Sequence, residues 1–267
     1  MAKNIQNPGS ALGEAIGAEM EKALNSFLTD IAESAGHHFV SKGFDSDGRQ
    51  TKKLLMFDTF GTSYNIDSVI ANQAMQPIVL VESKYIRYKK HNRDKGSWVC
   101  TAHTALRKRY PSIRSSIAVL AGSWSLTSIA MMKSHDINIF LIPFERICDL
   151  LSAHGIMFDW GEKDRAGAIA AWSKFTHLSV AERANIGDAM IEPIKDTLKT
   201  SVLTILDETR ERQVDRVSIE LHSNTGEVKI YEFTTVAEAV EFLNSETLRG
   251  VFITTDSPSL FDSFPPA

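Results

Sequence analysis

Two charged residues stand where an apolar segment gives way to polar sequence. Residues 78–84 read Ile-Val-Leu-Val-Glu-Ser-Lys, so a run of four aliphatic residues ends at Glu82 and Lys84. Such a run is typical of a strand buried on both faces. Because side chains two residues apart share a face of a strand, Glu82 and Lys84 are expected to point together, with Ser83 pointing away.

The preceding apolar segment, residues 64–70, supplies a second carboxylate at Asp67. If the two segments pair antiparallel through a loop centred between Ala74 and Met75, Asp67 lies directly opposite Glu82, unless the register shifts by one residue. Directly opposed residues have Cβ atoms about 5 Å apart, so the two carboxylates repel each other unless positive charge lies between them. A divalent cation would supply that charge, and Mg²⁺ favours a few carboxylates together with water and substrate phosphate.

A strongly basic segment follows at once. Residues 84–114 hold ten Lys or Arg and one acid, Asp94, a formal charge of +9 in a chain whose net charge is −4. A local field of this kind suits a polyanion such as a nucleic-acid backbone, and the alternative is a solvated basic face. The candidate phosphate contacts are Arg87, Lys89, Lys90, Arg93 and Lys95.

The apolar pattern predicts the elements that position these groups. Apolar residues at helical spacing from Ala11 to Ile31 predict an opening helix that ends at Gly36. Strand-like segments and helices alternate after it, which predicts an α/β fold with a mixed central sheet flanked by helices. Strands are expected at residues 53–60, 64–71, 78–85, 116–121 and 137–142, and helices at 98–110 and 126–134.

In this setting, Asp67 and Glu82-Ser83-Lys84 resemble the motif of the PD-(D/E)XK nuclease superfamily, which includes restriction enzymes, resolvases and repair nucleases. The resemblance covers residues 10–145 and implies a restriction-endonuclease-like core. It implies that Asp67, Glu82 and the backbone carbonyl of Ser83 hold the metal. It also implies that Lys84 orients or activates the attacking water.

The first helix adds to the resemblance. The stretch from Gly17 to Glu21 is similar to the family's glycine-to-glutamate spacing, which implies Glu21 as an accessory acid of the metal site. One residue departs from the pattern, since Ile66 rather than proline precedes Asp67. The chemistry that the motif implies is stabilisation of phosphate charge by a Lewis-acidic metal and by Lys84.

The pattern changes beyond residue 160. Ser179 and Glu182 have the spacing of a capping box, which opens a helical pattern that runs to about Gln213. Pro193 is expected to kink or split that helix.

Alternating segments at residues 216–221 and 227–233 flank Ser-Asn-Thr-Gly, which predicts a hairpin, and a last helix is expected at 236–244. We therefore expect a nuclease core at residues 1–160 and a helical and hairpin region at 161–267 that serves recognition or dimerisation.

Composition sets the remaining expectations. The 267 residues are 43% hydrophobic and 23% charged, and the two cysteines, Cys100 and Cys148, have no zinc-ligand spacing, so a reducing cytoplasmic location is expected. No apolar run has the length of a signal peptide or a membrane span. The absence of GxxxxGKS, GxGxxG and GxSxG patterns excludes most ATPases, dehydrogenases and esterases.

The expected function is Mg²⁺-dependent hydrolysis of DNA phosphodiester bonds by a type II restriction endonuclease. Double-stranded DNA is the expected partner, and a homodimer would supply the two active sites needed to cut both strands. The alternatives within nucleic-acid chemistry are a structure-specific or defence-associated nuclease with the same site, and a nuclease-like DNA-binding protein that has lost catalysis. A metabolic α/β enzyme with a coincidental Glu-x-Lys is the remaining alternative.

Overall fold

The computed structural model describes residues 7–43, 50, 53–89, 92–245, 248 and 250–252. By its contacts the chain divides into two compact units, Met1–Asp207 and Glu208–Ala267. The helices of the first unit are α1 (Pro8–Ser34), α2 (Asn92–Arg109), α3 (Leu126–Lys133), α4 (Phe144–Ser152), α5 (Arg165–His177), α6 (Val180–Ile191) and α7 (Lys195–Leu206), with a 3₁₀ helix at Glu192–Ile194. Its strands are β1 (His38–Val40), β2 (Leu54–Phe57), β3 (Ser63–Ile66), β4 (Ser68–Ala71), β5 (Pro77–Ile86), β6 (Ser115–Gly122) and β7 (Ile137–Pro143).

A five-stranded sheet forms the centre of the first unit, with the strand order β1-β4-β5-β6-β7. β4 pairs antiparallel with β1 and with β5, whereas β6 pairs parallel with β5 and with β7. β2 and β3 form a separate antiparallel ribbon. The expected α/β fold with a mixed sheet is confirmed.

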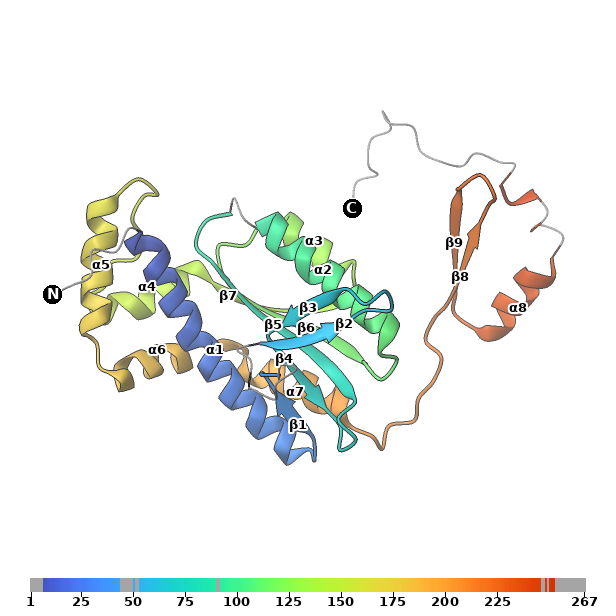
Figure 1. Ribbon diagram of the computed structural model, residues 1–267, viewed down its shortest axis with the longest axis horizontal. Helices are drawn as coiled ribbons and strands as arrows, with labels where there is room; N and C mark the ends of the chain where they lie inside the picture. Colours follow the sequence, from blue (N-terminus) through green and yellow to red (C-terminus); the bar gives the residue numbers. More distant parts are fainter. Residues whose placement is uncertain are drawn as a thin grey trace. The chain divides into compact units, whose positions relative to one another are not determined.

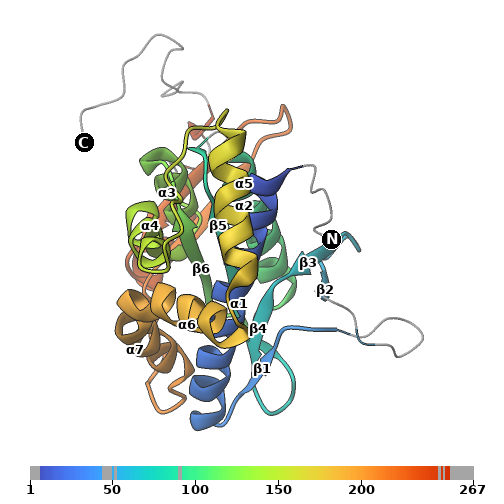
Figure 2. The ribbon, with the colours of Figure 1, turned by 90° about the vertical axis from the view of Figure 1, so that its left-hand side faces the viewer.

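Helices cover both faces of this sheet. One face packs against α1 and α4 to α7, in a core that includes Val79 and Val81 of β5. The other face packs through Leu80 and Ile86 against α2, α3 and the β2–β3 ribbon. Figure 1 shows α2 and α3 together, and Figure 2 shows α1 beside α5. Since alternate residues of β5 face opposite layers, Glu82 and Lys84 belong to the α2 face and Ser83 to the α1 face.

The first helix begins at Pro8, three residues before the predicted pattern, and ends at Ser34, just before the predicted stop at Gly36. The Asn7 side chain accepts a hydrogen bond from the backbone N–H of Ser10, and Pro8 takes the first helical position, where its missing N–H is harmless. Gly36 follows the helix with φ at 71°, a conformation that glycine adopts without strain.

Two segments that the sequence predicts as single elements, one strand and one helix, are each interrupted in the structure. The segment expected as one strand over residues 64–71 breaks at Asp67 into β3, which pairs with β2, and β4, which joins the sheet. The helix expected from Ser179 is opened by the capping box and split by the 3₁₀ turn that contains Pro193; its last part, α7, ends at Leu206.

The boundary between the compact units follows Asp207, whereas the sequence placed one near residue 160. The reason is packing, since α5, α6 and α7 bury apolar side chains in the same core as α1. Among these are Phe175, Ile186 and Leu198. By packing, therefore, the first unit extends through these three helices.

The second unit contains the expected hairpin and helix. β8 (Val217–His222) and β9 (Val228–Phe233) pair antiparallel and are followed by α8 (Val236–Asn244). Phe242 of α8 packs against Tyr231 and Phe233, with ring centroids 4.5 and 5.2 Å apart. No helix in the described part of the chain has the length and apolar character needed to cross a membrane.

Candidate active site

The register between β4 and β5 brings the two predicted acids together. Ser68 pairs with Val81 and Val69 with Leu80, the register that places Asp67 next to Glu82. Asp67 itself lies in the break between β3 and β4, so its backbone is free to make other bonds. Its N–H donates to Glu82 Oε1 at 3.3 Å.

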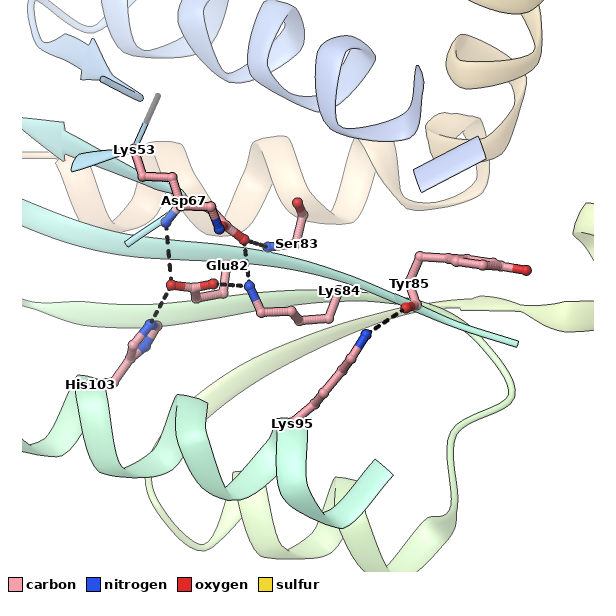
Figure 3. A network of polar contacts seen from close by, with 8 residues as sticks. All are labelled: Lys53, Asp67, Glu82, Ser83, Lys84, Tyr85, Lys95 and His103. Carbon is pink, nitrogen blue, oxygen red and sulfur yellow. Dashed lines mark hydrogen bonds and ion pairs between the residues drawn. The ribbon is translucent and has the colours of Figure 1, made fainter. Parts of the chain in front are cut away.

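Strand β5 also binds the Asp67 side chain through its backbone. The N–H of Ser83 donates to Asp67 Oδ2 at 3.1 Å (Figure 3). Because the N–H and C=O of one strand residue face the same neighbour, the Ser83 carbonyl is directed toward the same edge as Asp67. Figure 3 shows the Ser83 side chain on the other side of β5 from Glu82 and Lys84, as the sequence predicts.

Lys84 occupies the position between the two carboxylates. Its Nζ lies 2.6 Å from Asp67 Oδ2 and also forms an ion pair with Glu82 Oε2 (Figure 3). A second ammonium, that of Lys53, lies 2.8 Å from Asp67 Oδ1. Sequence reasoning assigned the positive charge between the acids to a divalent cation; in this structure lysine side chains provide it.

The pKa values of the two carboxyls are shifted in opposite directions. Burial in the core raises the pKa of Glu82, which is 0% exposed, to about 8, and the neighbouring Lys84 charge only partly offsets this. Burial acts on Asp67 in the same direction, but the charge of Lys84 and hydrogen bonds with Glu82, Lys53 and Lys84 outweigh it. They hold the pKa of Asp67 well below its usual value.

The ammonium of Lys84 stays charged in this setting. Burial would lower the pKa of Lys84, but the Glu82 and Asp67 carboxyls more than compensate and raise it. Its Nζ also lies 5.7 Å from the ring centroid of Trp98 on α2. The cluster therefore holds a fixed positive charge beside an ionised Asp67.

Two further residues, Lys53 and His103, belong to this cluster. Lys53 belongs to no local motif and reaches Asp67 because β2 and β3 pair, so only the tertiary structure identifies it. His103 of α2 is 1% exposed and places Nε2 4.0 Å from Glu82 Oε1. Burial, with the Lys84 charge, lowers the pKa of His103 to about 3, so its ring is neutral.

A cleft of about 880 Å³ opens beside the cluster. Asp67, Ser83, Lys84 and Lys53 line it, together with Glu21 of α1. Burial raises the pKa of Glu21, the Asp67 charge adds to the rise, and Lys53 and Lys84 oppose it. The sequence-predicted accessory acid therefore lies within electrostatic reach of Asp67.

Glycines allow α1 to approach β5 here. A Cβ at Gly13 would lie 3.2 Å from the Tyr85 ring, and a Cβ at Gly17 would lie 3.3 Å from the Tyr85 Cβ. Larger residues at these two positions would push the helix away from the strand. Gly17 therefore helps to bring Glu21, one turn farther along α1, to the cleft.

The basic segment is divided between surface and interior. Lys89, Arg93 and Lys95 are exposed, and Lys90 lies outside the described residues. Lys95 also lines the cleft, where its Nζ donates to the Tyr85 carbonyl at 3.3 Å. These three cations are therefore accessible from solvent.

Arg87 lacks the exposed position expected of a phosphate contact, because it is only 8% exposed. Its Nη2 donates to the carbonyls of Phe158 and Trp160 at 2.8 and 2.7 Å, and its guanidinium carbon lies 3.5 Å from the Trp160 ring centroid. This placement argues against the expected DNA contact. Arg87 instead ties the segment that follows α4 to the end of β5.

The oxygen donors fit a small hard cation. Among the described residues, no three or more His, Cys, Asp or Glu side chains form a metal-binding group. Mg²⁺, however, commonly uses one or two carboxylates, with water and substrate phosphate completing its octahedron. Asp67 and Glu82 converge on a single ammonium, which shows that both carboxylates can face one cation.

Comparison of the chain with protein-family models, with curated proteins and with solved structures found no match.

Proposed function

We propose that this protein is a Mg²⁺-dependent endonuclease that hydrolyses DNA phosphodiester bonds, and specifically a type II restriction endonuclease of the PD-(D/E)XK superfamily with a restriction-endonuclease-like core. The observation that carries the proposal is the convergence of Asp67, Glu82 and Lys84 at the end of a central strand, beside a cleft. Two carboxyl groups and a lysine at one strand end are groups that metal-assisted hydrolysis can use, the first to bind Mg²⁺ and the second to add positive charge beside the phosphate.

In this proposal Asp67, Glu82 and the Ser83 carbonyl hold the metal, with Glu21 as an accessory acid. Bound Mg²⁺ supplies a Lewis acid that stabilises charge on the phosphate and lowers the pKa of water. Lys84 contributes a fixed positive charge beside the scissile phosphate and orients the attacking water. Its 18% exposed side chain already reaches the cleft, where substrate would enter.

The surrounding cations bind the rest of the substrate. Lys89, Arg93 and Lys95 are exposed along the chain that follows β5, and contacts of this kind position a DNA backbone without reading its sequence. A homodimer would bring two such sites to the two strands of a duplex. A cytoplasmic location agrees with a DNA substrate.

The decisive experiment is incubation of plasmid and phage DNA with the protein in Mg²⁺ or in EDTA. Discrete fragments in Mg²⁺ alone support restriction, and a smear indicates a non-specific nuclease. Asp67→Ala, Glu82→Ala and Lys84→Ala should each abolish cleavage while the fold is kept. Glu14→Gln is a matched control, because Glu14 is an exposed carboxylate that lines the same cleft. Normal cleavage by a folded Glu82→Ala protein would refute the assignment.

A second candidate function has its own structural support. Lys84 contacts both Asp67 and Glu82, an arrangement that needs no metal and would suit a nuclease-like protein that only binds DNA. The two candidates differ in their response to the metal. If the site is catalytic, millimolar Mg²⁺ should raise the melting temperature of the wild type and not that of Glu82→Ala. DNA binding without cleavage and without any Mg²⁺ effect on melting would favour the second candidate.

A further inference from the structure

The β2–β3 ribbon ends in a turn whose backbone is held by several hydrogen bonds. We call residues 58–62 the ribbon tip. Asp58 Oδ1 accepts hydrogen bonds from the N–H groups of Phe60 and Thr62, both at 2.8 Å. The N–H of Asp58 donates to the Thr62 carbonyl at 3.0 Å. From α2, Arg109 Nη1 donates to the Asp58 carbonyl at 2.6 Å. These bonds hold the backbone of the tip in one conformation and tie it to α2.

This fixed turn presents an aromatic side chain to solvent. Phe60 is 93% exposed, and Leu55 and Phe57, which share one face of β2, are 45% and 40% exposed. The other face of the ribbon is ordinary core, since Met56 and Ile66 pack against the sheet and α2. Single exposed apolar residues are common, but three along one short ribbon form a patch suited to a partner.

The surroundings of the patch are basic. Lys53 precedes β2 and its side chain is 51% exposed. Lys108 and Arg109, at the end of α2, are exposed, and Arg109 contacts the tip directly. Aromatic side chains among cations are typical of nucleic-acid surfaces, where rings stack on bases and cations meet phosphates.

The ribbon is also continuous with the candidate active site, since β3 runs directly into Asp67. Leu54 pairs with Ile66 at the end near Asp67, and Phe57 pairs with Ser63 next to the tip. At about 3.3 Å per strand residue, the five residues from Asp67 to Thr62, where the tip begins, span roughly 17 Å. That distance corresponds to about five base-pair steps of a duplex.

We propose that Phe60 is a DNA-contacting residue that stacks on a base near the cleavage point, with Leu55 and Phe57 supporting the contact. The proposal rests on the proposed function, because it requires DNA at the cleft. A base is favoured over an apolar protein surface by the flanking cations and by the continuity of the ribbon with the site. The fixed backbone of the tip suits stacking, since the direction in which Phe60 leaves the chain is set before DNA arrives.

Binding without cleavage tests this inference. A labelled duplex of about 30 base pairs, with and without a central mismatch, is titrated in EDTA and followed by fluorescence anisotropy. The mismatch matters because an unpaired base stacks outside the helix more easily. Phe60→Ala should weaken binding to the mismatched duplex about ten-fold, a loss typical of one stacked base. Phe60→Trp should retain the affinity, and Phe60→Leu, which keeps apolar area without a flat ring, should not.

Val180→Ala is the matched control, because Val180 is an apolar residue of α6 that is 76% exposed and lies away from the ribbon in sequence and in its contacts. Its affinity should equal that of the wild type. Equal affinities of Phe60→Ala and wild type would overturn the inference and leave the proposed function intact. A lower oligomeric mass of Phe60→Ala in sedimentation would also overturn it, by identifying the patch as a protein contact. A wild type that binds no DNA would refute both.

Discussion

Replacement of Glu82 by glutamine should make the metal-free protein more stable, and by an amount that grows with pH. Burial of the Glu82 carboxyl raises its pKa from 4.5 to about 8, so the folded protein keeps a proton that the unfolded chain has already released. Between these two pH values the unfolded state binds fewer protons, and stability falls as pH rises. Glutamine has the same shape and no proton to lose.

The size of the effect follows from the two pKa values. A difference of about 3.5 corresponds to about 5 kcal/mol when the group is ionised in both states. At pH 5 the penalty is only about 1 kcal/mol, and at pH 8 it approaches about 4 kcal/mol. Relaxation and water entry reduce such penalties in real proteins. We therefore expect Glu82→Gln to gain about 2–4 kcal/mol over wild type between pH 5 and pH 8.

Urea unfolding of both proteins in EDTA at pH 5, 6, 7 and 8 measures this gain. Packing differences between the two side chains are the same at every pH, so they cancel in the change. His103 adds the same pH dependence to both proteins, because burial lowers its pKa to about 3 in the fold while it titrates near its ordinary value in the unfolded chain, so its contribution cancels in the comparison. Glu14→Gln, at an exposed carboxylate, should show no such trend. Parallel curves for wild type and Glu82→Gln would mean that Glu82 is already ionised at pH 5, contrary to our reasoning.

Three further predictions concern Asp67, the basic residues that follow β5, and His103. Asp67→Asn should destabilise the protein by about 1–3 kcal/mol at pH 7, because Asp67 accepts bonds from Lys53, Lys84 and the Ser83 N–H; an increase in stability would contradict its lowered pKa. Arg87→Ala should lower the free energy of unfolding by about 3 kcal/mol, whereas Lys89→Ala should leave it unchanged. Lys89→Ala should instead reduce the slope of log affinity for DNA against log salt concentration by about one. The same slope as wild type would place Lys89 outside the interface. His103→Leu should raise the melting temperature in EDTA, since neither buried ring nitrogen has a hydrogen-bond partner among the described residues; a clear decrease would contradict this reasoning.

The different protonation of Asp67 and Glu82 cannot be predicted from the local sequence around either residue. Asp67 and Glu82 are both buried carboxyls on adjoining strands, yet one is held ionised and the other protonated near neutral pH. The difference arises because Asp67 accepts hydrogen bonds from Lys53 and from the Ser83 N–H, whereas Glu82 lies deeper, against the neutral ring of His103. Pairs of acids with separated proton affinities are typical of catalytic sites.

Local sequence patterns are enough to predict strand β5, the face that carries its charged residues, and its pairing with the preceding strand. The aliphatic run before Glu82 specifies a doubly buried strand, since such a run is stable only between two layers. Alternation along that strand places Glu82 and Lys84 on one face. Loop length and hydrophobic pattern fix the pairing of the neighbouring strand, and Ser68 indeed pairs with Val81 as the proposed register requires. These are local rules, so one sequence suffices to apply them.

The positions of Lys53, Arg87 and the Lys84 ammonium depend on packing between segments that are distant in sequence. Lys53 reaches Asp67 because a ribbon folds back over the sheet, and Arg87 is buried because Phe158 and Trp160, more than 70 residues away, cover it. A run of basic residues cannot reveal which member is enclosed, since burial depends on what packs there from distant sequence. The same reason applies to the cation between the acids. Two opposed carboxylates require a positive charge between them, and only three-dimensional packing places the ammonium of Lys84 in that position.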